Sequence, residues 1–391
     1  MRASIVLLGL LPGLLMACGE RTLLVGELLD SGGWGGAGAA GSEVGGVSAA
    51  GLGNAAGHRG QQPPRERTFI LGADISWVQE EEDAGTSYVD DGIEQDILAI
   101  LRHHGFNYVR LRIFHDPSSP CRESESGDET CGYQFEFGTR AEPYCDLEHT
   151  LEMARRVKGA GLGLLLDFHY SDTWADPDDQ NKPLAWETLE FDDLVQAVHD
   201  YARDTLLVFR SAGVLPDMVQ IGNGITRGFL FPDGSSRTPG NFARFATLLK
   251  SAIAGARSVE PSPLIMLHIE KPDDLATSEW WMDSVIEQGV DFDIVGQSCY
   301  PEWQGTSADW APTFAALAER YPDYDFVVAE YSQEKRAVND ILFELPDGRG
   351  LGSFIWEPTQ WGETLFDREG SRRIANEWLG VFDEMAADYI Q

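Results

Sequence analysis

From about residue 67, short apolar runs alternate with stretches in which apolar residues recur at helical spacing. Such runs are typical of buried parallel strands, which need not alternate between apolar and polar residues. Eight runs predict strands, at Phe69–Ser76, Tyr108–Phe114, Gly163–His169, Met218–Asn223, Leu264–Ile269, Phe292–Tyr300, Phe326–Tyr331 and Gly352–Glu357. Eight strand–helix units predict a single α/β domain, a (β/α)8 TIM barrel, over residues 67–391.

Two of the intervening stretches show the helical spacing most clearly. One predicted helix face ends before Gly105 and consists of Ile93, Ile97, Ile100, Leu101 and His104. A second ends before Gly159 and consists of Leu147, Leu151, Ala154 and Val157. A doubly wound open sheet is the alternative, but the glycine-rich phosphate loop expected after its first strand is absent from the sequence.

The N-terminal residues predict a targeting signal and a linker rather than part of the folded domain. Residues 1–17 combine Arg2 with a short apolar run that ends at Ala17, which is typical of an export signal. Cys18 follows as in a lipoprotein signal, so lipidation of Cys18 is expected, and a plain secretory signal is the alternative. Residues 18–66 are rich in Gly and Ala and predict a flexible tether. We expect an exported protein, lipid-anchored at the bacterial cell surface or periplasmic side, or otherwise secreted.

The charge excludes two classes of partner. The chain has 29 basic and 64 acidic side chains and a formal net charge of −35. A nucleic-acid ligand needs a basic surface, and so does docking on anionic lipid, so the only membrane contact expected is the lipid anchor. A neutral ligand such as a sugar is not repelled, and a monomer is expected.

The cysteines and histidines give no clear metal motif. Cys121 and Cys131 bracket a polar loop and are the first candidates for a disulfide, although four cysteines allow three pairings. Cys299 lies in a strand-like run and predicts a buried free thiol. Metal binding by the cysteines is a weaker alternative, because the sequence has neither CxxC nor HExxH spacing. His103–His104 is interpreted as positive charge at a helix C-terminus and Asp90–Asp91 as a helix start, so no metal or cofactor is predicted.

Polar and aromatic residues gather where the predicted strands end. In a barrel these carboxyl ends meet at one mouth, where function resides. Arg110 and Arg112 are two apart and point the same way, and a buried arginine needs a carboxylate, for which Glu330 is the candidate. Tryptophans follow the strands at Trp77, Trp174, Trp186, Trp303, Trp356 and Trp361. Aromatic faces with carboxylates favour a carbohydrate-binding groove.

Several segments resemble one enzyme family. They are GADISWVQEEEDAG, NYVRLRIFHDP, YCDLEHTLEMARRVKGAGLGLLLDFHYSDTWADP, KPLAW, MVQIGN and FIWEP. The chain resembles glycoside hydrolase family 53, the endo-β-1,4-galactanases that cut arabinogalactan type I side chains of pectin. The resemblance covers residues 69–385 and implies a TIM barrel with a retaining mechanism and two catalytic glutamates, after strands four and seven.

The resemblance assigns roles to residues of this chain. Glu330 matches the nucleophile, Arg110 matches the arginine that keeps the nucleophile ionised, and Tyr300 matches the strand-six tyrosine beside it. Matched positions and the other residues at strand ends together make up the predicted substrate-binding set. It consists of Asp74, Trp77, His169, Asp172, Trp174, Asn223, His268, Trp303 and Trp356.

The acid/base position departs from the family pattern. The family reads Ile-Gly-Asn-Glu after strand four, whereas this chain reads Ile221-Gly222-Asn223-Gly224. Glycine has no proton to give, and general acid–base catalysis is typically worth about 10²–10⁴-fold in rate. Further departures occur at His268-Ile269-Glu270, Cys299, Glu302, Phe231 and Ile355.

Three hypotheses follow. The first is a galactan hydrolase with impaired turnover, in which Glu270, Glu302 or Asp172 would have to act as a surrogate acid. The second is a cell-surface galactan-binding lipoprotein that has lost turnover. The third is a barrel recruited to other chemistry or to a structural role.

Overall fold

The computed structural model describes residues 68–118, 122–123, 129–130 and 144–390. The predictions for the signal at 1–17, the tether at 18–66, lipidation of Cys18 and a Cys121–Cys131 disulfide lie outside the described residues. Among the residues described, no helix is both long and apolar enough to cross a membrane.

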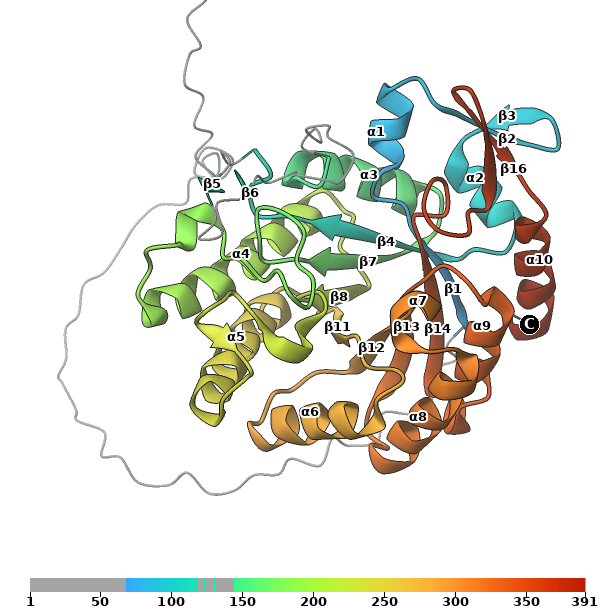
Figure 1. Cartoon of the computed structure of the whole chain (residues 1–391). Helices are drawn as coiled ribbons and strands as arrows, with labels where there is room; N and C mark the ends of the chain where they lie inside the picture. Colours follow the sequence, from blue (N-terminus) through green and yellow to red (C-terminus); the bar gives the residue numbers. More distant parts are fainter. Residues whose placement is uncertain (1–67, 119–121, 124–128, 131–143, 391) are drawn as a thin grey trace, which may run out of the picture. The chain divides into compact units, whose positions relative to one another are not determined.

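Eight parallel strands close into a barrel (Figure 1) in the order β1-β14-β13-β12-β11-β8-β7-β4. Their bounds are β1 (Ile70–Asp74), β4 (Tyr108–Ile113), β7 (Gly163–Phe168), β8 (Met218–Ile221), β11 (Leu264–Ile269), β12 (Ile294–Cys299), β13 (Asp325–Tyr331) and β14 (Gly350–Trp356). Each corresponds to one predicted strand, and neighbouring strands pair in parallel around the ring. The TIM-barrel prediction is therefore confirmed.

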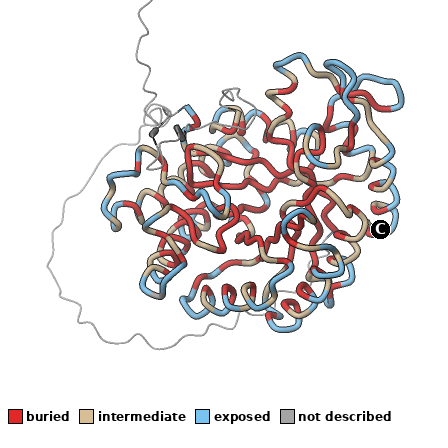
Figure 2. Tube along the Cα trace, in the orientation of Figure 1, coloured by how far each residue is buried: buried red, intermediate tan, exposed pale blue. Residues whose placement is uncertain are grey.

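Helices cover the outside of the barrel. The longer ones are α2 (Ile97–His103), α3 (Leu147–Gly159), α4 (Phe191–Ser211), α5 (Pro239–Arg257), α6 (Leu275–Glu287), α8 (Ser307–Arg320), α9 (Lys335–Phe343) and α10 (Trp378–Tyr389). Figure 2 shows the barrel strands buried along most of their length, while exposed residues lie on the helices outside them. One apolar cluster fills the barrel interior, with Leu165, Met218 and Phe354 among its members, and a larger one packs the helices onto the strands.

One predicted helix is confirmed and the other begins later than expected. Helix α3 starts after Asp146, whose side chain accepts a hydrogen bond from the His149 amide at 2.8 Å. Ile93 does not belong to a helix: it lies in β3 (Ile93–Gln95) and is 62% exposed. Helix α2 begins only after Asp96, which caps it through the Leu98 amide.

A turn explains that correction. Asp90 ends strand β2 (Ser87–Asp90) instead of starting a helix, and it pairs with Ile93 across an antiparallel hairpin. The two loop residues, Asp91 and Gly92, have φ values of 48° and 78°. Asp-Gly is favoured in two-residue hairpin turns because both positions need positive φ. The local turn chemistry therefore outweighs the apolar spacing.

The hairpin belongs to a second sheet beside the barrel. Its order is β15-β16-β2-β3, with β15 (Phe366–Glu369) and β16 (Arg372–Ala375) contributed by the C-terminal part of the chain. Strand β16 pairs with β2 in parallel, and Arg373 pairs with Glu81. This sheet was not predicted, because its strands are short and their partners lie nearly 300 residues apart in sequence. Shorter two-stranded pieces are β5 (Arg122–Glu123) with β6 (Glu129–Thr130), and β9 (Gly228–Phe229) with β10 (Gly234–Ser235).

Candidate active site

A buried arginine organises the mouth of the barrel. Arg110 lies on β4 and is fully buried. Its guanidinium donates to Asp74 Oδ2 at 2.8 Å and to Asp167 Oδ2 at 2.7 Å, and it lies 2.9 Å from Glu330 Oε1. The three carboxylates come from β1, β7 and β13. Burial of an arginine is stable only with such partners, so the predicted Arg110–Glu330 pair forms within a larger charged cluster.

A second arginine supports the aromatic side of the mouth. Arg112 donates to Asp74 Oδ1 at 2.9 Å and to Glu357 Oε1 at 2.5 Å. Its guanidinium carbon lies 4.4 Å from the ring centroid of Trp174 and within 5.6 Å of the centroids of Trp77 and Trp356. Cation–π contact at these distances holds three tryptophans together over one buried charge.

Asp74 holds the two arginines and does not face the groove. The side chain is fully buried, and Ser76 donates to it through both its amide and its hydroxyl. The arginines lower the pKa of Asp74 against the effect of burial. The prediction that Asp74 contacts substrate is therefore replaced by a supporting role.

Replacing Asp74 tests that role. Asp74→Asn keeps the size of the side chain but leaves Arg110 and Arg112 short of one negative charge. We expect the free energy of unfolding to fall by about 3–5 kcal/mol, as for a broken buried ion pair, measured by urea unfolding at pH 7. Asp178→Asn removes a carboxylate that is 80% exposed in its pair with Arg227, so it is the matched control. That control should change stability by less than about 1 kcal/mol; equal effects would contradict the supporting role.

Glu330 is the one carboxylate of the Arg110 cluster that is partly open to solvent. It lies near the end of β13, and its side chain is 13% exposed, whereas those of Asp74 and Asp167 are fully buried. Tyr300, directly after β12, donates a long hydrogen bond of 3.5 Å to Glu330 Oε2. Burial raises the pKa of Tyr300 well above its usual range, so the phenol keeps its proton. One oxygen of Glu330 thus lies on a guanidinium and the other beside a hydroxyl.

The protonation of Glu330 depends on two opposing effects. Burial raises the pKa of the carboxyl, and Arg110 lowers it without fully offsetting the burial. The resemblance implies an arginine that keeps the nucleophile ionised, and the ion pair is present, but the resulting pKa still lies above the usual value. A nucleophile must be ionised, so the acidic limb of any activity should lie at a higher pH than that of an ordinary glutamate.

Asn223 and His268 are positioned by hydrogen bonds beneath the mouth. Asn223 Oδ1 accepts from Arg110 at 3.0 Å and lies 2.7 Å from His268 Nδ1. His268 Nε2 lies 2.8 Å from Ser298 Oγ. Burial, together with the charge of Arg110, lowers the pKa of His268 to about 3, so its imidazole is neutral at any working pH. Both predicted substrate-binding residues are buried, and their polar atoms are engaged within the protein.

His169 is buried in the same way. Its Nδ1 accepts from the Ala175 amide at 2.9 Å, which leaves the proton on Nε2, 3.1 Å from Asp167 Oδ2. Asp172 is also a supporting residue, because it accepts from the amides of Leu184 and Asp116 at 2.7 and 3.1 Å. These contacts hold the loop after β7 against its neighbours.

The backbone at Gly224, which the resemblance matches to the acid/base position, is shaped for glycine. Gly224 has φ 59° and ψ 46°, in the left-handed region that disfavours side chains with a Cβ. A Cβ at this position would lie 3.0 Å from Cδ and 3.2 Å from Cγ of Pro177. Backbone conformation and packing at position 224 therefore both fit a glycine, and a larger side chain would need more than a change of one residue.

The three candidate surrogate acids have different surroundings. Asp172 is occupied as described above, and Glu302 is exposed and accepts from Gln333 at 2.6 Å. Glu270 follows β11 and is buried. It accepts a hydrogen bond of 2.9 Å from the hydroxyl of Thr226, which lies two residues after Gly224 in the chain. Burial raises the pKa of Glu270, which favours its protonated form. Of the three carboxylates, Glu270 is thus the one whose surroundings shift its pKa in the direction that a general acid requires.

Glu270→Gln tests this protonation state. The native pKa is raised above that of the unfolded chain, so ionising Glu270 lowers stability as pH rises through that interval. The glutamine variant avoids this cost. We expect its free energy of unfolding, relative to wild type, to increase from pH 4 to pH 7, measured by urea unfolding at each pH. Glu287→Gln, at an exposed position on α6, should show no such trend.

Aromatic rings form a belt on the mouth beside Glu330. Trp77 lies 5.1 Å from Trp356 between ring centroids, and Trp356 lies 4.6 Å from Trp361. The ring centroid of Trp361 lies 5.4 Å from that of Tyr300 and 6.4 Å from that of Trp303, which stacks on Trp361. Trp303 is 66% exposed. Trp186 is not part of this belt, because it is buried against His115 and Tyr201. The belt offers several ring faces along a path across the mouth.

Sequence reasoning missed four residues of the site: Arg112 as a scaffold, Asp167, Gln220 and Glu357. Asp167 and Gln220 pair in register with each other on β7 and β8, and Gln220 accepts from Arg110 at 3.2 Å. A polar residue inside an otherwise apolar strand was the available signal. Among other predictions, Cys299 is confirmed as a buried free thiol.

Comparison with known proteins shows the family to which the chain belongs. A closed parallel barrel with a partly exposed glutamate on an arginine and an aromatic belt at its mouth has the features of the barrel glycosidases, apart from their second catalytic carboxylate. The family model for glycosyl hydrolase family 53 matches residues 70–340. The chain belongs to glycosyl hydrolase family 53, as the sequence resemblance predicted.

Individual relatives agree with that family. An arabinogalactan endo-beta-1,4-galactanase of Thermothelomyces thermophilus is 36% identical over 322 residues, which are 73% of this chain and 88% of the relative. An uncharacterized protein of Niallia circulans is 35% identical over 79% of this chain and 92% of its own. The solved catalytic domain of an Ignisphaera aggregans family 53 protein has a TM-score of 0.69 at 32% identity, covering 81% of this chain and 95% of that domain. A solved fungal beta-1,4-galactanase has the same TM-score at 30% identity, covering 81% and 99%.

Proposed function

We propose that this protein acts on β-1,4-galactan as a retaining glycosidase whose turnover of natural polysaccharide is slow. The observation that carries the proposal is Glu330, held on Arg110 beside Tyr300 as a nucleophile would be, in a chain with glycine at the position that the resemblance matches to the acid/base. The galactanases among its relatives support galactan as the substrate. The acidic chain, with a net charge of −35, suits a neutral glycan.

The proposed site supplies the nucleophile of the reaction but not its general acid and base. In the first step the ionised Glu330 attacks the anomeric carbon and the bond to the leaving sugar oxygen breaks. That oxygen would depart as an alkoxide unless it receives a proton, and Gly224 has none to give. In the second step water must attack the glycosyl–enzyme without a general base at the same place. Both steps therefore lose the acid–base contribution, about 10²–10⁴-fold.

Two substrates that differ in their leaving groups test this proposal. Hydrolysis of a 2,4-dinitrophenyl β-galacto-oligosaccharide needs no proton on the leaving phenolate, so its first step should be fast. Release of reducing sugar from galactan should be slower by at least about 10²-fold. Azide, which attacks without a general base, should accelerate turnover of the aryl substrate and give the β-galactosyl azide. Equal rates on both substrates would contradict the proposal and point to a surrogate acid, for which Glu270→Gln is the next variant.

A second candidate function is galactan binding without turnover. The specific observation in its favour concerns Gly224. Its left-handed backbone and the neighbouring Pro177 both disfavour a side chain at this position, as expected of a site that is no longer selected for catalysis. The aromatic belt would still bind galactan. Calorimetry with β-1,4-galactotetraose that shows binding, while no product forms from either the aryl substrate or galactan, would favour this function.

We further propose that the protein acts outside the cytoplasm, anchored through Cys18 as a lipoprotein and separated from the membrane by residues 18–66. The export-type residues before Cys18 support this placement. Cys18→Ala should move the mature protein from the membrane fraction to the soluble exported fraction.

A further inference from the structure

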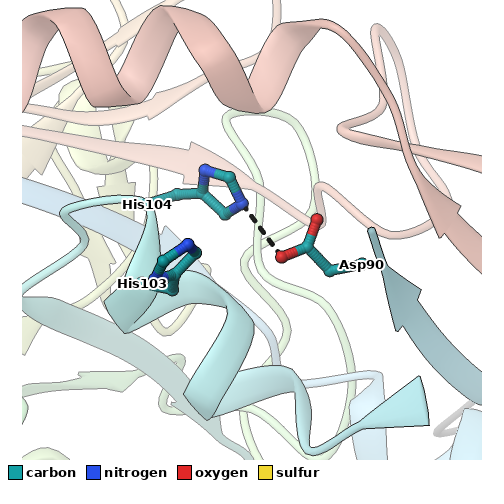
Figure 3. Close-up of side chains that lie close together, drawn as sticks. All are labelled: Asp90, His103 and His104. Carbon is teal, nitrogen blue, oxygen red and sulfur yellow. Dashed lines mark hydrogen bonds and ion pairs between the residues drawn. The ribbon is translucent and has the colours of Figure 1, made fainter. Parts of the chain in front are cut away.

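Two histidines and an aspartate lie together away from the barrel mouth. Among the residues that the structure describes, Asp90, His103 and His104 are the group whose ligand atoms could hold one metal ion, all within 4.8 Å of one another. Asp90 ends β2 of the side sheet, and the histidines end helix α2. Figure 3 shows the two imidazoles side by side, with His104 directed at the Asp90 carboxylate.

His104 is held between two carboxylates. Its Nδ1 lies 3.0 and 3.1 Å from the two oxygens of Asp383 on α10, and its Nε2 lies 3.3 Å from Asp90 Oδ2. A neutral imidazole has one N–H, and the contact with both Asp383 oxygens places it on Nδ1. The Nε2 lone pair then faces a carboxylate oxygen, which is repulsive unless a cation lies between them.

That cation is either a second proton or a metal ion, and three features favour the metal. Ligands at 2.0–2.1 Å from a tetrahedral Zn²⁺ lie about 3.3 Å apart, which is the His104–Asp90 separation. His103 adds a third ligand that a simple ion pair does not require. The Asp383 contact to Nδ1 is the carboxylate–histidine arrangement that orients metal-binding imidazoles.

The surroundings suit a positive ion. The site lies at the C-terminal end of α2, where the helix dipole favours cations, in a chain with a net charge of −35. It is also firmly positioned. Phe106, just beyond α2, stacks on Phe382 of α10 at 4.3 Å between ring centroids, and a Cβ on Gly105 would lie 2.3 Å from that of Ala386. Helix α2, which supplies both histidines, and helix α10, which supplies Asp383, are therefore already packed against each other.

We propose that Asp90, His103 and His104 bind one Zn²⁺, with water as the fourth ligand and Asp383 supporting His104. The ion joins the side sheet to α2 and, through Asp383, to α10. It stabilises the fold and takes no part in sugar chemistry. The sequence interpretation of His103–His104 as helix charge is extended: the same C-terminal position that suits a positive imidazole also suits a metal ion.

Zinc binding is measured on the purified, tag-free full-length chain. Titration calorimetry with Zn²⁺ after EDTA treatment and dialysis should show one ion per chain, and the melting temperature should rise by several degrees at saturation. Co²⁺ should give visible absorption bands typical of a tetrahedral site. His103→Ala removes an exposed ligand, so the metal-free variant should melt as wild type does while Zn²⁺ affinity falls at least 10-fold. Asp383→Asn should weaken binding by about 10–100-fold.

His199→Ala is the matched control. His199 lies 3.0 Å from Asp200 on α4 and forms a histidine–carboxylate pair that belongs to no three-ligand group among the described residues. This variant should bind Zn²⁺ as wild type does. Absence of saturable 1:1 binding, or equal affinity in His103→Ala and wild type, would overturn the proposal and leave His104 in contact with Asp90 and Asp383 alone.

Discussion

Glu330→Ala should lower hydrolysis of the 2,4-dinitrophenyl β-galacto-oligosaccharide by at least about 10³-fold, because it removes the group that attacks the anomeric carbon. Fold stability should be retained. Arg110 keeps Asp74 and Asp167 as partners, and burial already raises the pKa of Glu330, so its ionised form is costly to hold. Steady-state kinetics at pH 7, with thermal melting of the same samples, measure both effects.

Azide identifies the role of Glu330 by stereochemistry. In Glu330→Ala, azide can occupy the space of the missing carboxylate and attack from the same face, giving the α-galactosyl azide. Wild type should give the β-azide, because the sugar is first transferred to Glu330 and then attacked from the opposite face. NMR of the anomeric proton distinguishes the two products. Glu287→Gln on the outside of the barrel is the control and should retain wild-type rates. A β-azide from Glu330→Ala would show that another group is the nucleophile.

Gly224→Glu in a Pro177→Ala background should increase galactan cleavage by about 10²–10⁴-fold, the usual contribution of a general acid and base. The single variant should gain less, since the glutamate must adopt φ near 59° at a cost of about 1–3 kcal/mol and its Cβ would crowd Pro177. Hydrolysis of the dinitrophenyl substrate should change little in its first step. Reducing-sugar release from galactan, compared with aryl-substrate kinetics, separates these effects.

Gly224→Gln/Pro177→Ala is the matched control for that gain. It makes the same demands on backbone and space but offers no titratable proton, so it should stay at the wild-type rate. An equal gain in the glutamine variant would mean that packing, not proton transfer, limits wild type. If wild type already matches the glutamate variant, the glycine is not limiting and another acid acts. If no variant cleaves galactan while galactotetraose still binds, the other departures in the mouth prevent catalysis.

The barrel and much of its mouth could be predicted because both depend on local sequence. Each strand is an apolar run that can be recognised by itself, and parallel strands in a closed barrel bring their carboxyl ends together. The spacing of Arg110 and Arg112 places both on one face, and Glu330 follows its own strand. A family resemblance then assigned the nucleophile and exposed the missing acid at Gly224.

Other parts depend on contacts between distant segments. Asp74 reads as a polar residue at a strand end, and only its burial beneath Arg110 and Arg112 distinguishes support from sugar contact. The Asp91–Gly92 hairpin needs β16 as its partner, more than 280 residues away, before it becomes part of a sheet. No local pattern specifies such pairings, because their stability comes from surfaces that meet after the chain has folded.

Gly224 and His104 show most clearly what the sequence determines and what the fold determines. The sequence alone shows that position 224 has no carboxyl, because this follows from the identity of one residue. That Pro177 packs where a Cβ would lie, and that Asp90 and Asp383 approach His104 from two sides, required the folded molecule. Residue type and spacing limit the chemistry available to a chain, but the fold determines which groups meet, because hydrogen bonds and dispersion contacts require atoms within a few ångströms of each other.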